Sequence, residues 1–83
     1  KDVFHVVYAG LLTHNQSFVE VLKVLAELSL TESILLSLAG NISQEIIEEI
    51  KLSVPQVEVI YHGYLSHKDA VSLMKKAHLL QRF

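Results

Sequence analysis

Three short apolar runs, each followed by a single glycine, constrain the fold of this chain more than any other feature. The runs cover residues 3–9, 34–39 and 57–61, and the chain's three glycines come after them as Gly10, Gly40 and Gly63. The runs are rich in β-branched and aromatic residues and do not alternate cleanly with polar ones. This pattern is typical of strands that are buried on both faces of a parallel sheet.

Amphipathic helical patterns separate these runs. In residues 17–29 apolar side chains recur at three- and four-residue spacing, and Ser17 with Glu20 has the spacing of a capping box. A second helix is expected to begin near Asn41 or Ser43 and to end before Pro55. A third is expected to begin after Ser66. The apolar faces of the second and third helices are expected to bury, respectively, Ile46, Ile47 and Ile50, and Val71, Leu73, Met74 and Ala77.

Strands and helices therefore alternate, and a fourth apolar run at residues 78–83 follows the third helix. This order is the signature of consecutive right-handed crossover units in a parallel sheet. Without a β-carbon, glycine permits a positive φ or the close approach of a ligand, and open parallel sheets bind ligands at the carboxyl ends of their strands. We expect Gly10, Gly40 and Gly63 to mark three such ends.

Composition argues against several classes of partner. The chain has 83 residues, a net charge of −2 and scattered basic residues, which is no footprint for nucleic acid. Its uncharged apolar stretches are far shorter than the roughly 20 residues of a membrane-spanning helix. No secretory signal pattern is present. The chain has no cysteine, which excludes disulfides and thiolate chemistry.

Motif spacing gives no sign of a cofactor or a metal site. The segment "GLLTHN" lacks the further glycines of a dinucleotide-binding loop, and no phosphate loop of the GxxxxGK[ST] type occurs. The five histidines do not have the spacing of metal ligands. We expect His5 to pack within a strand, and His14, His62 and His67 to be solvated loop residues; the alternative is that one of these three touches a ligand. Tyr64, just after Gly63, either packs on the surface or offers a ring for stacking.

Three blocks resemble a known family: "FHVVYAGLL" with "SFVEVLKVLAEL", "ILLSLAGN", and "VEVIYHGYLSHKDAVSLMKKAHLL". Together they resemble the start of the C-terminal, nucleotide-sugar-binding domain of family-4-like GT-B glycosyltransferases. The resemblance covers nearly all of residues 1–83 but only the first half of that domain. It implies a Rossmann-like, three-layer α/β/α fragment with a four-stranded parallel sheet in the order 3-2-1-4 and three helices. The first two helices would share one face and the third would cover the other.

The resemblance also implies where the donor would bind. In such enzymes the loop after the first strand often carries an Arg and a Lys that hold the donor diphosphate, but the matching positions here are Leu11 and Gln16. Phosphate contact is expected within residues 10–16 and base contact within residues 63–65. No catalytic residue is expected, because the family's paired-glutamate motif would lie beyond Phe83. The implied donor-binding residues are Gly10, Leu11, Asn15, Gln16, Gly40, Asn41, Gly63, Tyr64 and Leu65.

By this resemblance, the intact parent protein transfers a sugar from a nucleotide-sugar donor to an acceptor in bacterial polysaccharide or glycolipid synthesis. Its expected location is the cytoplasm, or the inner face of the membrane. Residues 1–83 alone are expected to be inactive, because catalysis in this fold also needs the acceptor domain. The missing basic pair leaves an alternative open: a non-catalytic α/β module that binds a ligand or has a regulatory role.

Apolar content predicts self-association. Hydrophobic residues make up 51% of the chain, which is high for a domain of this size. The sequence stops inside the apolar run "HLLQRF", so we expect it to be a fragment with an unpaired strand edge. Association is expected through this fourth strand or through the sheet face that carries only the third helix.

Overall fold

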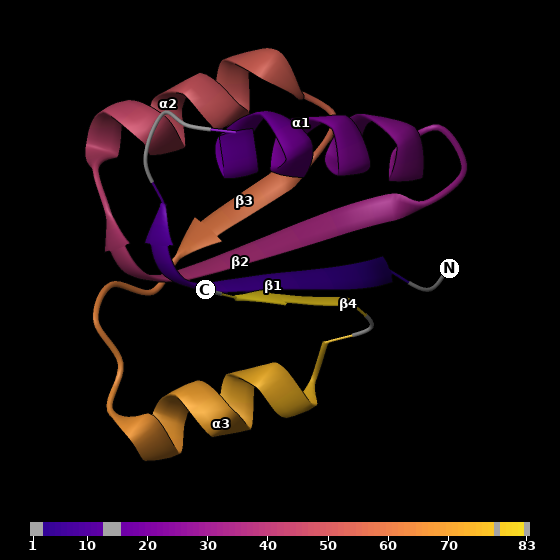
Figure 1. Cartoon of the computed structure of the whole chain (residues 1–83). Helices are drawn as coiled ribbons and strands as arrows, with labels where there is room; N and C mark the ends of the chain where they lie inside the picture. Colours follow the sequence, from indigo (N-terminus) through magenta and orange to yellow (C-terminus); the bar gives the residue numbers. More distant parts are fainter. Residues whose placement is uncertain (1–2, 13–15, 78, 83) are drawn as a thin grey trace.

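The chain folds into parallel strands that alternate with helices (Figure 1). The computed structural model describes residues 3–12, 16–77 and 79–82. Its elements in chain order are β1 (Val3–Leu12), α1 (Gln16–Leu28), β2 (Ser33–Ile42), α2 (Gln44–Ser53), β3 (Glu58–Tyr61), α3 (His67–Lys75) and β4 (Leu79–Arg82). The predicted α/β class, with parallel strands joined by three helices, is confirmed.

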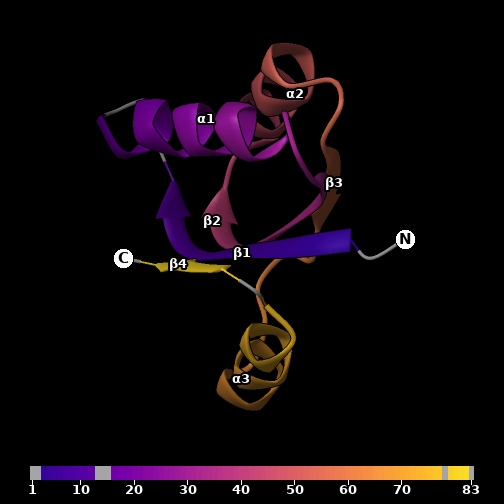
Figure 2. The ribbon, with the colours of Figure 1, turned by 90° about the vertical axis from the view of Figure 1, so that its right-hand side faces the viewer.

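The strands form one sheet in the order β3-β2-β1-β4, and each neighbouring pair is parallel. In the long β1–β2 pair, Val6 lies beside Leu36 and Gly10 lies beside Gly40. Helices α1 and α2 cover one face of the sheet and α3 covers the other, as Figures 1 and 2 show. This distribution follows from right-handed crossovers that first move in one direction and then reverse to place β4 beside β1.

The hydrophobic core lies between the sheet and the α1–α2 layer. Because side chains alternate along a strand, the even-numbered residues of β1 and β2 point into this layer. They meet the apolar stripes of both helices, including the predicted Ile46, Ile47 and Ile50 of α2, which are all buried. The buried cluster consists of Val6, Tyr8, Leu12, Phe18, Val21, Leu25, Ile34, Leu36, Leu38, Ile42, Ile46, Ile47, Ile50, Val54 and Val57.

Serine side chains cap the N-termini of the second and third helices. The Ser43 hydroxyl oxygen accepts a hydrogen bond from the amide of Ile46 at 3.3 Å, and that of Ser66 accepts one from Asp69 at 3.2 Å. Each bond satisfies an amide that has no carbonyl partner inside its own helix. The expected starts of these helices are confirmed. Helix α1 begins at Gln16, one residue before Ser17, which was expected to precede it as a cap.

Both central strands continue beyond the glycines that were expected to end them. β1 runs on to Leu12 and β2 to Ile42, with residues 10–12 still paired in register to residues 40–42. The reason is hydrophobic: Leu12 and Ile42 are buried in the core. Figure 1 shows the last part of each strand turning toward α1 and α2. Gly10 and Gly40 therefore mark a bend in paired strands and not their ends.

Helix α3 covers its face of the sheet only partly. No residue of α3 is buried, and the side chains predicted to be buried, Val71, Leu73, Met74 and Ala77, are each half-buried. The prediction fails because, in the described part of the chain, α3 is the one helix on its face of the sheet (Figure 2). The sheet beside it stays open: Leu35 is half-buried and Ile60 is 40% exposed.

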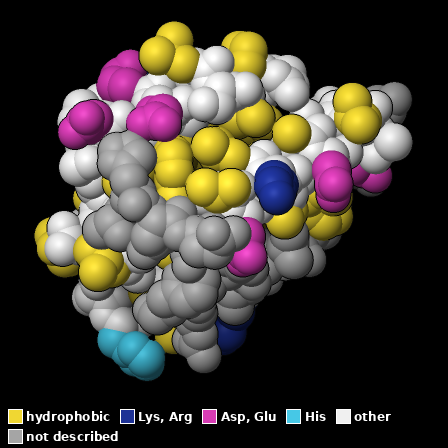
Figure 3. Space-filling view, turned by 45° about the horizontal axis from the view of Figure 1, so that its top comes forward, with side chains coloured by type: hydrophobic (Ala, Val, Ile, Leu, Met, Phe, Trp, Pro, Cys, Tyr) yellow, Lys and Arg dark blue, Asp and Glu magenta, His cyan; other side chains and the backbone are white. Residues whose placement is uncertain are grey.

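The side covered by α1 and α2 also shows apolar side chains at its surface (Figure 3). Val19 and Val24 of α1 are exposed, as are Leu30 after α1 and Leu52 near the end of α2. Acidic side chains lie among them on this face (Figure 3). Scattered apolar residues of this kind are normal for protein surfaces. They indicate no binding site.

The bend at Gly40 yields a stability prediction. A β-carbon at Gly40 would overlap the carbonyl oxygen of Gly10, and φ there is +113°, whereas Gly63 has φ +75° with open space around it. Gly40→Ala should lower the free energy of unfolding by about 3 kcal/mol or more, and Gly63→Ala by only about 1 kcal/mol. Urea unfolding of the two variants measures the difference; equal losses would contradict the close approach.

The open face beside α3 yields a prediction about assembly. Exposed Ile60 and the half-buried side chains of α3 leave apolar surface available, and such surface tends to find a partner when it is contiguous. We expect sedimentation equilibrium to show an apparent mass that rises with protein concentration. Ile60→Lys should weaken this association, whereas Leu30→Lys, on another part of the surface, should not. A single monomeric species at high micromolar concentration would contradict the expectation.

Candidate functional site

The carboxyl edge of the sheet brings the three glycines together. Gly10 and Gly40 lie side by side in the β1–β2 register. The amide of Gly40 donates a hydrogen bond to the carbonyl oxygen of Gly63 at 2.9 Å. All three glycines have positive φ, at 131°, 113° and 75° in chain order. Residues that are far apart in the sequence thus form one strip of closely packed backbone.

Two further hydrogen bonds hold the end of β3 against β2. The amide of His62 donates to the carbonyl oxygen of Leu38 at 2.8 Å. The Tyr61 hydroxyl donates to the carbonyl oxygen of Gly40 at 2.7 Å. Together with the bond between Gly40 and Gly63, they fix residues 61–63 on the neighbouring strand. The loop that follows therefore starts from a defined place on the sheet edge.

A buried tyrosine supports the same edge from the core side. Tyr8 is 1% exposed, and its hydroxyl donates to the carbonyl oxygen of Leu11 at 2.8 Å. This bond spans the bend at Gly10 and satisfies a carbonyl beyond it. Burial removes water from the phenol and so raises the pKa of Tyr8 above its ordinary value of 10.0. The phenol is a structural hydrogen-bond donor here.

The predicted donor-binding residues have different surroundings. Leu11 is 55% exposed and Asn41 is exposed, so both strands present a side chain to solvent just beyond the bend. Tyr64 is 77% exposed and Leu65 is half-buried. Gln16 is the first residue of α1. The prediction for Asn15 falls outside the described residues.

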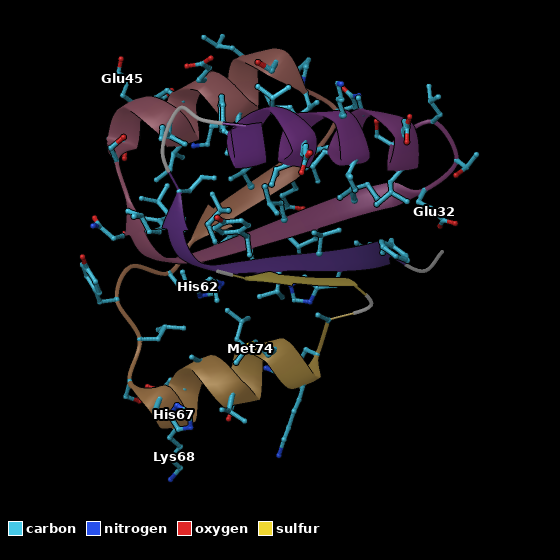
Figure 4. All side chains as sticks on the ribbon, in the orientation of Figure 1. Glu32, Glu45, His62, His67, Lys68 and Met74 are labelled. Atoms are coloured by element: carbon cyan, nitrogen blue, oxygen red, sulfur yellow. The ribbon has the colours of Figure 1, made fainter. Side chains whose placement is uncertain are left out.

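The segments that form this edge carry few charged side chains, and Glu45 and Asp69 come directly after two of them. These segments, residues 8–12, 38–44 and 61–68, contain no Asp or Glu, and their basic residues are His62, His67 and Lys68. Figure 4 shows His62 close to the sheet, and His67 and Lys68 at the start of α3, farther from it. Among the residues that the structure describes, no group of three or more His, Asp or Glu side chains is placed to hold a metal ion.

His5 lies away from this edge. Its Nε2 atom and the Oγ atom of Ser37 are hydrogen-bonded at 2.7 Å, and Ser37 is 2% exposed. Both residues belong to the odd-numbered set of β1 and β2, which faces the α3 side of the sheet. His5 is therefore a packed strand residue, as predicted. This hydrogen bond gives the buried hydroxyl of Ser37 a partner inside the sheet.

Two residues that support the edge were not foreseen from the sequence. Tyr61 was predicted only as part of an apolar strand, and His62 as a loop residue that is either solvated or touches a ligand. Nothing in "VIYHGY" shows that the Tyr61 hydroxyl reaches back to Gly40, because that contact depends on the register between β2 and β3. The available signal was the aromatic residue directly before a predicted turn.

Comparison with known proteins adds no assignment, since no protein-family model and no curated protein matches the chain. None of the helices in the described part of the chain is long and apolar enough to cross a membrane.

The buried phenol of Tyr8 predicts how stability depends on pH. In the unfolded chain this group ionises near its ordinary pKa of 10.0, but in the folded chain it keeps its proton to higher pH. The folded state then binds more protons, so the free energy of unfolding falls as pH rises above about 10.

Denaturant titrations between pH 8 and pH 11 on the unmodified chain and on Tyr8→Phe measure this effect. The variant should lose about 1 kcal/mol at pH 8, because the bond to Leu11 is gone. It should then show a shallower alkaline decline. Identical slopes for the two proteins would contradict a protonated Tyr8 in the folded state.

Proposed function

We propose that this chain is part of the donor-binding domain of a glycosyltransferase, and that the intact parent protein transfers a sugar from a nucleotide-sugar donor to an acceptor. The observation that carries the proposal is the strip made by Gly10, Gly40 and Gly63 at the carboxyl edge of parallel strands. Such an edge, in a sheet built from crossover units, is the ordinary ligand site of open α/β folds. The resemblance of the sequence to GT-B donor domains then suggests the ligand.

The sheet order supports a Rossmann-like arrangement of this site. The chain moves from β1 to β2 to β3 in one direction and then returns to place β4 on the other side of β1. Ligands of open α/β sheets bind where the strand order reverses, outside the carboxyl ends of the strands. Here that position is next to the bend at Gly10, where β4 ends with Arg82 beside Ala9.

A second candidate function is favoured by one observation. Residues 10–16, where phosphate contact is expected, contain no Lys or Arg. A fixed cation is the usual partner of a diphosphate. The alternative is therefore a non-catalytic α/β module that binds a ligand without a diphosphate.

Under the first proposal the parent protein works in the cytoplasm or at the inner face of the membrane, in polysaccharide or glycolipid synthesis.

Titration with nucleotides distinguishes these functions. We expect UDP, GDP or ADP to shift the amide signals of ¹⁵N-labelled chain at residues 10–12, 40–41 and 63–65. The chain alone should show no sugar transfer from the matching nucleotide sugars. Shifts confined to the opposite edge, near Val3, Ser33 and Glu58, would contradict the proposed site. An absence of binding by all three nucleotides would favour the alternative module.

A further inference from the structure

We propose that two copies of this chain associate edge to edge, with β3 of one copy antiparallel to β3 of the other, so that the two sheets become one. β3 is the last strand in the order β3-β2-β1-β4, and no described strand lies on its outer side (Figure 2). Glu58, Ile60 and Tyr61 of this strand are exposed. Residues 57–63 contain no Lys or Pro, which often protect an exposed strand from pairing. The inference goes beyond the proposed function, since it needs no ligand.

The outer edge of β3 has a defined set of main-chain groups. The amide of His62 donates to the carbonyl oxygen of Leu38, and Leu38 lies opposite Tyr61 in the parallel register. In a parallel pair, this strand turns the main-chain groups of alternate residues toward its neighbour. Ile60 and His62 therefore face β2, whereas Val59 and Tyr61 turn their N–H and C=O groups outward. These outward groups are the ones that a second strand would pair with.

Their directions limit the register of a symmetric dimer. In an antiparallel pair, two residues that lie opposite each other exchange both N–H···O=C bonds, and the next opposite pair exchanges none. Val59 of each copy can exchange its bonds with Tyr61 of the other, which places Ile60 opposite Ile60 on the two-fold axis. A shift by one residue would set outward groups of one copy against groups of the other that already face β2.

The neighbouring symmetric registers are disfavoured by bonds that the chain already makes. A two-fold axis at Val59 would set Tyr61 opposite Val57, whose amide donates within the turn before β3 at 2.9 Å. An axis at Tyr61 would set Val59 opposite Gly63, whose carbonyl oxygen accepts an amide of β2 at 2.9 Å. The axis at Ile60 avoids both conflicts and leaves the outward groups of both residues free to bond.

The side chains that meet in this register are complementary. Val59 packs against the core, so Glu58, Ile60 and His62 share the other face of the strand. With Ile60 on the axis, Glu58 of each copy lies opposite His62 of the other, and an imidazole can donate a hydrogen bond to a carboxylate. On the core side Val59 lies opposite Tyr61. A β-branched residue opposite an aromatic one is a favourable cross-strand pair.

An exchange of charges tests the register. His62→Glu would set carboxylates opposite each other at both ends of the paired strands, so the dimer dissociation constant from sedimentation equilibrium should rise about tenfold. Adding Glu58→Lys to this variant restores pairs of opposite charge and should return the constant to its original value or below. The matched controls Glu27→Lys and His67→Glu change the charge of exposed residues on α1 and α3 and should leave the constant nearly unchanged.

A cysteine on the axis tests the strand pairing directly, because the chain has no cysteine of its own. Opposite residues that exchange no hydrogen bonds have Cα atoms about 4.5 Å apart, which is within disulfide range. Ile60→Cys should therefore form a disulfide-linked dimer under mild oxidation. Leu35→Cys is the control, because it lies on β2, beside Glu58. In the edge dimer its two copies are separated by at least three strand spacings, roughly 14 Å, and should not be linked.

Three outcomes would overturn the proposal. If Glu58→Lys fails to rescue His62→Glu, or if no substitution on β3 changes the association, the copies meet elsewhere, as through β4. Equal cross-linking of Ile60→Cys and Leu35→Cys would show that the open sheet faces meet and not the edges. A single monomeric species at high micromolar concentration would exclude the dimer. Amide spectra at low concentration show whether each variant keeps the fold, which is expected because Glu58, Ile60 and His62 are exposed.

Discussion

The close approach of Gly10 and Gly40 is the constraint on which the rest of the structure depends. A side chain at Gly40 would occupy the space of the Gly10 carbonyl group, and Gly10 itself has φ 131°, a conformation that favours glycine, so β1 and β2 can bend together here. The bend carries Leu12 and Ile42 into the core, where they close the end of the α1–α2 layer. It also leaves Leu11 and Asn41 facing outward. Core closure and the exposed edge thus have the same cause.

The two faces of the sheet differ in how many apolar side chains they bury. Nearly all the buried apolar side chains lie between the sheet and α1 and α2, where two helices share one face. Helix α3 has a serine cap and a half-buried apolar stripe but no buried residue. Its packing therefore contributes less to the free energy of folding than that of α2, which buries three isoleucines. Elements with few buried contacts open most easily. The loop that precedes α3 starts from a firmly held strand end and leads into the least buried helix.

The sequence predicted the fold more fully than the site, for a physical reason. Hydrophobic periodicity is a local property, so it predicts the alternation of strands and helices along the chain, the parallel pairing and a start of α2 near Asn41 or Ser43. The strand ends were wrong because a buried Leu12 or Ile42 looks the same in sequence whether a strand stops at the glycine or bends there. The predicted burial of α3 was wrong, because the apolar pattern of a helix indicates which side faces the protein but not how much of that side is covered.

The candidate site was harder to predict than the fold, because it consists mostly of main-chain groups. The bonds between Gly40 and Gly63, His62 and Leu38, and Tyr61 and Gly40 depend on strand register, which no single segment encodes. Side chains at such an edge need only permit the backbone conformation, as glycine does. The three hydrogen bonds to β2 hold the end of β3 and the start of the next loop, so the shape of this edge follows from the same strand pairing that forms the sheet.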